Sequence, residues 1–258
     1  MSISDYFRPR SCPGGSFWIR HSGTEYFIPE RCEKDHILDQ MRKLRNFYEL
    51  DLLESMRSRL QAGGVAIDVG ANIGNHSLYF AAVMGLRVVA FEPVQGNRDL
   101  LCRLIELNKQ HVQIDVIATA LSDQEGDVRL SAPAPGNSGT FRISGEVDGC
   151  PAKTERLDEA LRRLGVAMED VRVLKVDVEG HELQVLEGAP ELLSQANPMI
   201  AIEVFTMSLF DSVLDKLRPL GYRAVSVHCA TPTVLFSRDG VEAEKSVRAR
   251  IARYQVRR

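Results

Sequence analysis

Short apolar runs alternate with amphipathic stretches along most of the chain. The runs lie at 65–69, 87–92 and 112–120, and helical stretches begin near residues 74 and 96. Buried parallel strands are continuous apolar runs, and a helix between two of them carries the chain back across the sheet. The pattern therefore predicts an α/β fold with a doubly wound, mostly parallel sheet.

The segment before the first strand has a different pattern. Residues 16–29 mix aromatic and polar side chains, which is typical of a short hairpin. Residues 35–60 carry apolar positions at helical spacing, with a break near Asn46. We expect a small N-terminal cap over residues 1–60 that packs on a main domain over residues 61–240.

Three features leave alternatives open. Residues 131–153 are rich in Pro, Gly and Ser, so this insertion is either a lid over a binding site or a surface excursion. Residues 241–258 are basic and form either a solvated terminal helix or tail, or a contact for phosphate, an anionic glycan or a membrane face. Phe47 and Tyr48 either belong to the core or line a pocket.

The first predicted strand runs directly into a turn of small residues that opens a helix. Gly70 and Gly74 let the backbone turn tightly and bring helix-start N–H groups close to a bound group, which predicts a nucleotide-type cofactor pocket. A dinucleotide fingerprint needs glycine where this chain has Asn72 and Asn75. The Asp-x-Gly-x-x-x-Gly pattern that begins at Asp68 instead resembles the first motif of S-adenosylmethionine-dependent methyltransferases.

A carboxylate follows at the end of the second predicted strand. Glu92 comes about 20 residues after the turn, where a Rossmann-like unit places the acidic residue that binds ribose, and Pro93 stops the ladder. We expect Glu92 to accept hydrogen bonds from both ribose hydroxyls. Taken alone, Asp68 is interpreted as a turn or cap residue and Glu92 as an exposed strand end. Their spacing favours joint cofactor binding.

Three charged residues of one parity lie in the predicted strand 171–179. Lys175, Asp177 and Glu179 would project to the same side, at the end of the strand where open α/β sheets bind ligands. Buried charges must be paired or face a cleft. We expect at least one of them to contact cofactor or acceptor. The alternative is a salt-bridged network in which Lys175 neutralises Asp177 and the next helix start holds Glu182.

Composition narrows the class of protein. The chain has 258 residues and a net charge of −3, which gives no general attraction to nucleic acid. Its five cysteines are far apart, without a C-x-x-C pair, and are interpreted as reduced thiols of a cytoplasmic protein. No stretch is long and apolar enough to span a membrane, and no targeting segment is recognised.

Several blocks taken together resemble the FkbM family of methyltransferases. They are Asp68-Val69-Gly70-Ala71-Asn72-Ile73-Gly74-Asn75-His76, Phe91-Glu92-Pro93, Ala120-Leu121-Ser122-Asp123, Leu174-Lys175-Val176-Asp177-Val178-Glu179-Gly180-His181-Glu182-Leu183 and Leu186-Glu187-Gly188-Ala189. The block that begins at Leu174 is the most specific of these. The resemblance covers roughly residues 45–205.

The resemblance implies a class I methyltransferase fold, which is a Rossmann-like, seven-stranded and mostly parallel sheet. Apolar runs at 199–205, 222–227 and 233–236 supply the remaining strands, and the last is expected to run antiparallel beside the sixth. The cofactor implied is S-adenosylmethionine, with S-adenosylhomocysteine as product. Its expected contacts are Asp68, Gly70, Asn72, Gly74, Asn75, Glu92, Ala120, Ser122 and Asp177.

The chemistry implied is methyl transfer to a hydroxyl oxygen, which needs in-line alignment and a base for the hydroxyl proton. His181 is the first candidate base because histidine titrates near neutral pH, and Asp177 and Glu179 are the others. Glu179 is also expected to fix Lys175, and Glu203 is a candidate acceptor contact. The Asp, Glu and His spacing permits a divalent metal, but none is predicted.

We expect a sugar hydroxyl as acceptor, in glycan or glycolipid biosynthesis, with a small-molecule secondary metabolite as the alternative. A non-catalytic cofactor-binding scaffold is the alternative from another class. Nucleic-acid methylation loses support because residues 177–180 read Asp-Val-Glu-Gly where amino methyltransferases carry an Asp/Asn-Pro-Pro-Tyr/Phe segment, and no Pro-Cys nucleophile is present. A homodimer is compatible with the sequence.

Overall fold

The computed structural model describes residues 15–31, 35–131, 142–144 and 150–256. Its centre is a seven-stranded sheet with the order β12-β13-β11-β10-β3-β4-β5. The strands are β3 (Val65–Val69), β4 (Arg87–Phe91), β5 (Ile114–Ile117), β10 (Val171–Val176), β11 (Met199–Glu203), β12 (Arg223–His228) and β13 (Thr233–Ser237). Only β13 runs antiparallel to its neighbours, β11 and β12. The predicted fold class is confirmed.

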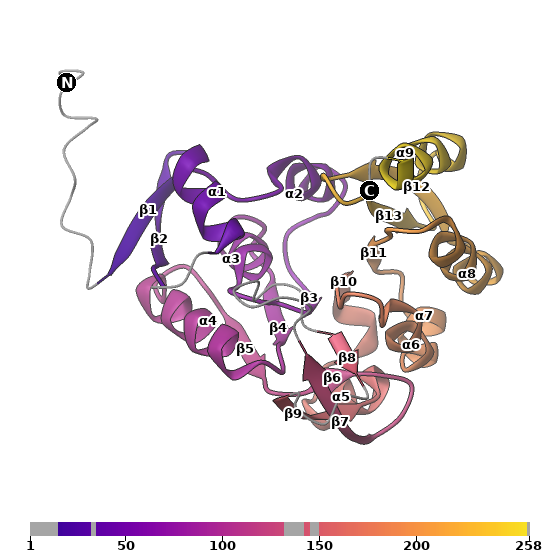
Figure 1. The fold of residues 1–258 in the computed structure, drawn as a ribbon, viewed down its shortest axis with the longest axis horizontal. Helices are drawn as coiled ribbons and strands as arrows, with labels where there is room; N and C mark the ends of the chain where they lie inside the picture. The colour runs from indigo at the N-terminus through magenta and orange to yellow at the C-terminus, as the bar shows by residue number, and fades with distance from the viewer. Residues whose placement is uncertain (1–14, 32–34, 132–141, 145–149, 257–258) are drawn as a thin grey trace.

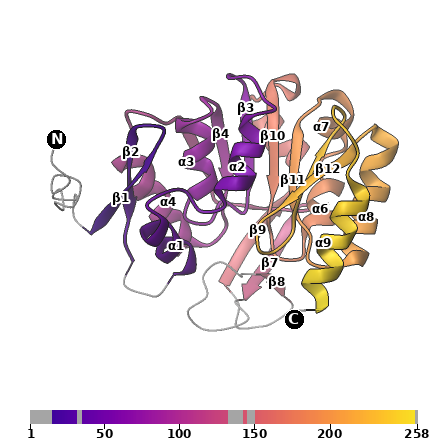
Figure 2. The same ribbon diagram turned by 90° about the horizontal axis from the view of Figure 1, so that it is seen from above.

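Helices cover both faces of this sheet (Figures 1 and 2). Alternate strand residues enter two separate cores: Ile67 and Val89 lie in one, while Ala66 and Val88 lie in the other. The helices of the second core are α1 (His36–Leu44), α2 (Leu50–Arg57), α3 (Asn75–Ala82) and α4 (Gln95–Leu107). Those of the first are α5 (Leu157–Arg163), α6 (Glu182–Glu187), α7 (Pro190–Gln195), α8 (Met207–Leu217) and α9 (Glu244–Val256), with 3-10 turns at Met168–Asp170 and Arg218–Leu220. The helices on both faces bury the central strands of the sheet, whereas the edge strand β5 is only half-buried.

The N-terminal segment is a hairpin followed by two helices. Strands β1 (Ser16–His21) and β2 (Thr24–Pro29) pair antiparallel, and β2 packs on α4. The helical stretch breaks after Leu44, because Arg45 has a φ of 52° and Glu49 a φ of 57°. The predicted hairpin and the break near Asn46 are both found.

A second, four-stranded sheet extends the fold between β5 and α5. It contains β6 (Ala120–Leu121), β7 (Gly126–Ser131), β8 (Arg142–Ser144) and β9 (Cys150–Glu155) in the order β6-β9-β7-β8. The predicted single strand over 112–120 is therefore wrong, since the chain leaves the central sheet after Ile117 and pairs with β9 instead. Because β9 continues to Glu155, the next helix, α5, begins only at Leu157. Most of the 131–153 insertion lies outside the described residues.

The predicted strand 171–179 is also too long, because β10 ends at Val176. Glu179 and Gly180 follow with φ values of 56° and 110°, which turn the chain toward α6. Asp177 and Glu179 therefore come from a loop rather than from the strand.

The C-terminal basic segment is helical over α9, which packs on β12 and α8 through Val247 and Ile251. Within the described ranges, no helix is long and apolar enough to cross a membrane. Cys102, Cys150 and Cys229 are free thiols, while Cys12 and Cys32 lie outside the described residues.

Candidate functional site

A cavity of about 300 Å³ opens at the carboxyl ends of β3, β4, β10 and β11. Ligands of open α/β sheets bind at this edge. Many predicted site residues line the cavity, namely Gly70, Asn72, Asn75, Glu92, Ala120, Lys175, Asp177, Glu179, His181 and Glu203. Asp68, Gly74 and Ser122 do not line it. Following the expectations from the sequence, we call the region around the loop after β3 the cofactor end of the cavity and the region around the loop after β10 its acceptor end.

The loop after β3 is held close to the loop after β10. Gly70 has a φ of +75°, and a Cβ atom there would lie 1.9 Å from the carbonyl oxygen of Asp177. The Asp177 N–H donates to the carbonyl of Val69 at 3.2 Å. Only glycine permits this approach, because any other residue would place a Cβ atom against the Asp177 carbonyl.

Glu92 fixes the same loop from the next strand. Its Oε2 accepts a hydrogen bond from the Asn72 N–H and its Oε1 accepts one from the Val94 N–H, both at 2.8 Å. The residue is 4% exposed, and burial raises the pKa of its carboxyl group above the usual value. Each oxygen has a further lone pair, so the carboxylate can still accept ribose hydroxyls.

Gly74 and Asn75 position the start of α3. Gly74 has a φ of +90°, and a Cβ atom there would lie 2.4 Å from the side chain of Leu101. The Asn75 side chain accepts from the Tyr48 N–H and donates to the Tyr48 carbonyl, both at 3.0 Å. Asn75 therefore ties the N-terminal segment to the cofactor loop.

Lys175 links the two ends of the cavity. Its Nζ lies 3.2 Å from Asp68 Oδ1 and 3.6 Å from Asp177 Oδ2, and it donates to the Gly70 carbonyl at 2.7 Å. Burial alone would lower the pKa of Lys175, but the two carboxylates outweigh burial and raise it. Asp68 is fully buried and also accepts from Ser77 Oγ at 2.6 Å. Asp68 therefore does not line the cavity itself but holds Lys175, which does.

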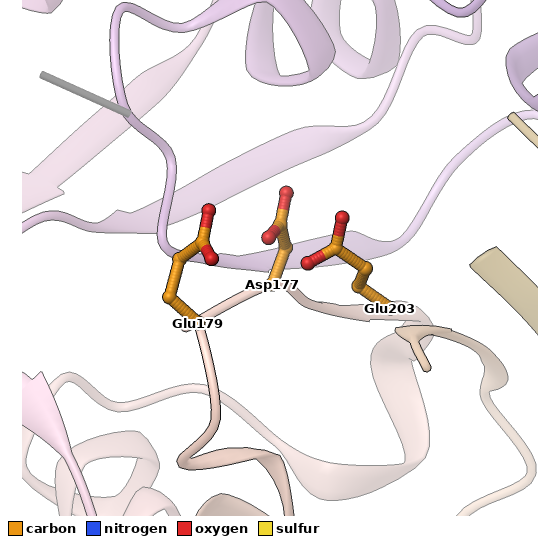
Figure 3. A group of neighbouring side chains, drawn as sticks. All are labelled: Asp177, Glu179 and Glu203. Atoms are coloured by element: carbon orange, nitrogen blue, oxygen red, sulfur yellow. The ribbon is translucent and has the colours of Figure 1, made fainter. Parts of the chain in front are cut away.

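Three carboxylates meet at the acceptor end (Figure 3). Oxygen atoms of Asp177, Glu179 and Glu203 all lie within 4.8 Å of one another. Burial, then Asp177 and Glu179, raise the pKa of Glu203 to about 10, so this carboxyl group is protonated near neutral pH. Oxygen ligands suit Mg²⁺ and Ca²⁺, so these three carboxylates are the group in the described residues that could hold a divalent ion.

Sequence reasoning missed a fourth carboxylate, Glu49. Its Oε2 lies 3.3 Å from His76 Nε2, and both side chains line the cavity. Burial would raise the pKa of Glu49, but its hydrogen bond and ion pair with His76 lower it. Neighbouring Tyr48 also lines the cavity, whereas Phe47 is fully buried in the core. The spacing of apolar residues does not show that the backbone of Glu49 is left-handed, so nothing in the sequence indicated that its side chain enters the cavity.

His181 also lines the cavity, and its ring contacts Ser122. Its Nε2 lies 2.8 Å from Ser122 Oγ, which donates its one proton to Asp123 at 2.9 Å. We infer that Nε2 carries a proton and donates it to Ser122. Burial lowers the pKa of His181 below its usual value. The neighbouring Glu182 accepts from the N–H groups of Val178 and Gly180.

The salt-bridged alternative for this segment is therefore present together with the cavity. Lys175 pairs with Asp177, and the start of α6 holds Glu182. The ion pairs found for Lys175 join it to Asp68 and Asp177, where the sequence predicted Glu179 as its fixing partner. Although it is paired, Asp177 still lines the cavity, and its side chain is 37% exposed.

Comparison with known proteins identifies a family. Residues 68–224 match the family described as "Methyltransferase FkbM domain". The chain is 34% identical over 163 residues to hexuronic acid methyltransferase AglP of Haloferax volcanii, with 62% of this chain and 64% of that protein covered. It is 29% identical over 165 residues to methyltransferase sdnD of Sordaria araneosa, covering 52% of this chain and 63% of that protein. The chain thus spans slightly under two-thirds of the length of these relatives.

Similar solved structures include a precorrin-6y C5,15-methyltransferase from Geobacter metallireducens, with a TM-score of 0.46 and 12% identity, covering 74% of this chain and 88% of that one. An rRNA methylase from Streptococcus thermophilus has a TM-score of 0.44 and 16% identity, covering 73% of this chain and 94% of that one.

Proposed function

Because this chain belongs to the FkbM family of methyltransferases, we propose that it is an S-adenosylmethionine-dependent O-methyltransferase that modifies a sugar hydroxyl in glycan or glycolipid biosynthesis. One observation carries the proposal. A single cavity joins a glycine-shaped cofactor loop to a group of carboxylates, and Lys175 contacts both ends.

The cofactor end fits an adenosyl group. Glu92 has a lone pair left on each oxygen for the ribose hydroxyls, and the loop from Gly70 to Asn72 brings the backbone close to the bound ligand. Ala120 lines the same cavity, while Gly74 and Ser122 support it from outside. Asp68 contributes indirectly, by holding Lys175.

The acceptor end supports proton removal by Asp177. Bound S-adenosylmethionine supplies an electrophilic methyl group on a positively charged sulfur. Asp177 takes the proton of the acceptor hydroxyl, and Lys175 holds its carboxylate in place. Protonated Glu203 donates a hydrogen bond to a second acceptor oxygen. We prefer Asp177 to His181 as the base because Asp177 lies beside Lys175 and among the carboxylates of the acceptor end, whereas the Nε2 atom of His181 contacts Ser122.

A sugar suits the acceptor end for two reasons. Carboxylates accept hydrogen bonds from several hydroxyls at once, and the Tyr48 ring gives the cavity an aromatic wall on which a sugar ring can pack. One relative is named for methylating a hexuronic acid. A small secondary metabolite is the second candidate. It is favoured by the similarity of this chain to part of the AMB antimetabolite synthetase AmbE of Pseudomonas aeruginosa, at 29% identity over 63% of this chain and 10% of that protein.

The proposal is tested by calorimetric titration with S-adenosylmethionine and S-adenosylhomocysteine. We expect micromolar affinity for both, reduced at least tenfold in Glu92→Ala. Glu159→Ala, an exposed carboxylate away from the cavity, is the control and should leave affinity unchanged. Binding would justify a screen of sugar acceptors by transfer of a labelled methyl group. No binding to either ligand would overturn the proposal and favour a structural role.

A further inference from the structure

A second cleft, of about 540 Å³, lies between α2, the β12–β13 turn and α9. Both helices pack on β12 (Figure 1). The polar residues that line the cleft are Asp51, His228, Ser246, Arg250 and Arg253. None of them belongs to the acceptor end or cofactor end defined above.

The arginines of α9 divide into two kinds. Arg248 is neutralised on one side of the helix, with Asp211 and Glu244 each 2.7 Å away. Arg250 and Arg253 face the cleft instead. Within the described part of the chain, neither of these two has a carboxylate partner, and Arg250 donates to the carbonyl of Cys229 at 2.7 Å. That hydrogen bond orients Arg250 and leaves most of its N–H groups available.

The other charged groups around the cleft leave it positive. Asp51 pairs with His228 at 3.4 Å, and the Asp51 side chain is 65% exposed. Arg59 is near enough to His228 to help burial lower the pKa of that histidine. Two guanidinium groups and one carboxylate line the cleft, and the carboxylate is already paired with His228, which favours an anionic ligand.

The cleft shares a wall with the active-site cavity. Cys229 and Ala230 line the cleft, and Thr231, the next residue in the same turn, lines the cavity. Thr231 Oγ1 also lies 3.5 Å from the hydroxyl of Tyr254 in α9. A ligand that crosses this turn can place one part near the acceptor carboxylates and another part against Arg250 and Arg253.

We propose that this cleft binds the diphosphate of a sugar diphosphate acceptor, so that the sugar enters the cavity while the arginines hold the phosphates. This inference rests on the proposed function and adds the chemical form of its acceptor. Guanidinium groups bind phosphate oxygens in pairs, and two arginines one helical turn apart match two phosphates. The diphosphate belongs to either a nucleotide-linked or a lipid-linked sugar.

The test is calorimetry on the full chain saturated with S-adenosylhomocysteine, with inorganic pyrophosphate as the first probe. We expect submillimolar binding that weakens about tenfold in Arg253→Gln and further in the Arg250→Gln/Arg253→Gln double variant. Lys245→Gln removes an exposed positive charge from the same helix and should change nothing. Uridine diphosphate and geranyl diphosphate, titrated next, distinguish the nucleotide source from the lipid source.

The outcomes separate the two proposals. Pyrophosphate that does not bind, or binds Arg253→Gln as well as it binds the unmodified protein, overturns the diphosphate site even if S-adenosylhomocysteine binds normally. Glucuronate that binds the cleft as tightly as pyrophosphate also overturns it, because a single carboxylate would then suffice. Absence of S-adenosylhomocysteine binding contradicts the proposed function whatever pyrophosphate does.

Discussion

The two ends of the cavity differ in how their carboxylates are held: backbone N–H groups hold Glu92 at the cofactor end, whereas three carboxylates lie close together at the acceptor end. At the cofactor end, both oxygens of Glu92 hold backbone N–H groups. At the acceptor end, Asp177, Glu179 and Glu203 lie close together, and Lys175 pairs with Asp177. In the proposed function, the cofactor end holds a fixed shape while the acceptor end takes up the proton of the hydroxyl.

The largest expected effect is on the rate. Asp177→Asn removes the proposed base, so kcat should fall about 10²–10⁴-fold while affinity for S-adenosylhomocysteine changes only a few-fold. Single-turnover methyl transfer to the acceptor measures the first quantity and calorimetry the second. Glu159→Gln, which changes an exposed carboxylate outside the cavity, is the control and should keep the full rate. A full rate in Asp177→Asn would return the assignment to His181.

The next effect tests the link between the ends. Lys175→Met leaves the fully buried Asp68 without its cation, which should cost about 3–5 kcal/mol of unfolding free energy. Urea denaturation measures it. In the double variant Asp68→Asn/Lys175→Met, the loss should be clearly smaller than the sum of the single losses, because no lone charge stays buried. Additive losses would contradict a coupled pair.

Gly70→Ala probes the shape of the cofactor end. A methyl group there overlaps the Asp177 carbonyl, so the two loops must separate, and both cofactor affinity and thermal stability should fall. Gly85→Ala is a close control, since Gly85 has a similar φ of +68° but open space around it. That variant should lose only about 1 kcal/mol from backbone strain. Equal losses in both variants would show that the close approach is unimportant.

The smallest effect has the opposite sign. The raised pKa of Glu203 means that the folded protein holds this proton more tightly than the unfolded chain does. Its contribution to stability is present below the ordinary carboxyl pKa and is lost as pH rises toward the folded value. Glu203→Gln removes that loss, so its Tm should exceed that of the unmodified protein by about 2 °C or more at about pH 8, and by less at about pH 5. Calorimetric scans at both pH values check this.

The sequence predicted much of the fold because its signals are local. The apolar run before Gly70 and the small-residue turn after it depend on neighbours in the chain, and both are found where expected. One of the failures has a long-range cause. The strand over 112–120 divides because Ala120 pairs with Thr154, and that pairing joins segments far apart in sequence.

The sequence by itself determined the doubly wound sheet, the cofactor loop at Gly70 and the acidic residue Glu92, because periodicity and turn chemistry act over a few residues. Only the tertiary structure decided that Glu49 and Glu203 share a cavity with Asp177, and that His181 is turned to Ser122. Burial, charge pairing and pKa depend on side chains that meet through folding, and their distances in space are not written in their spacing along the chain.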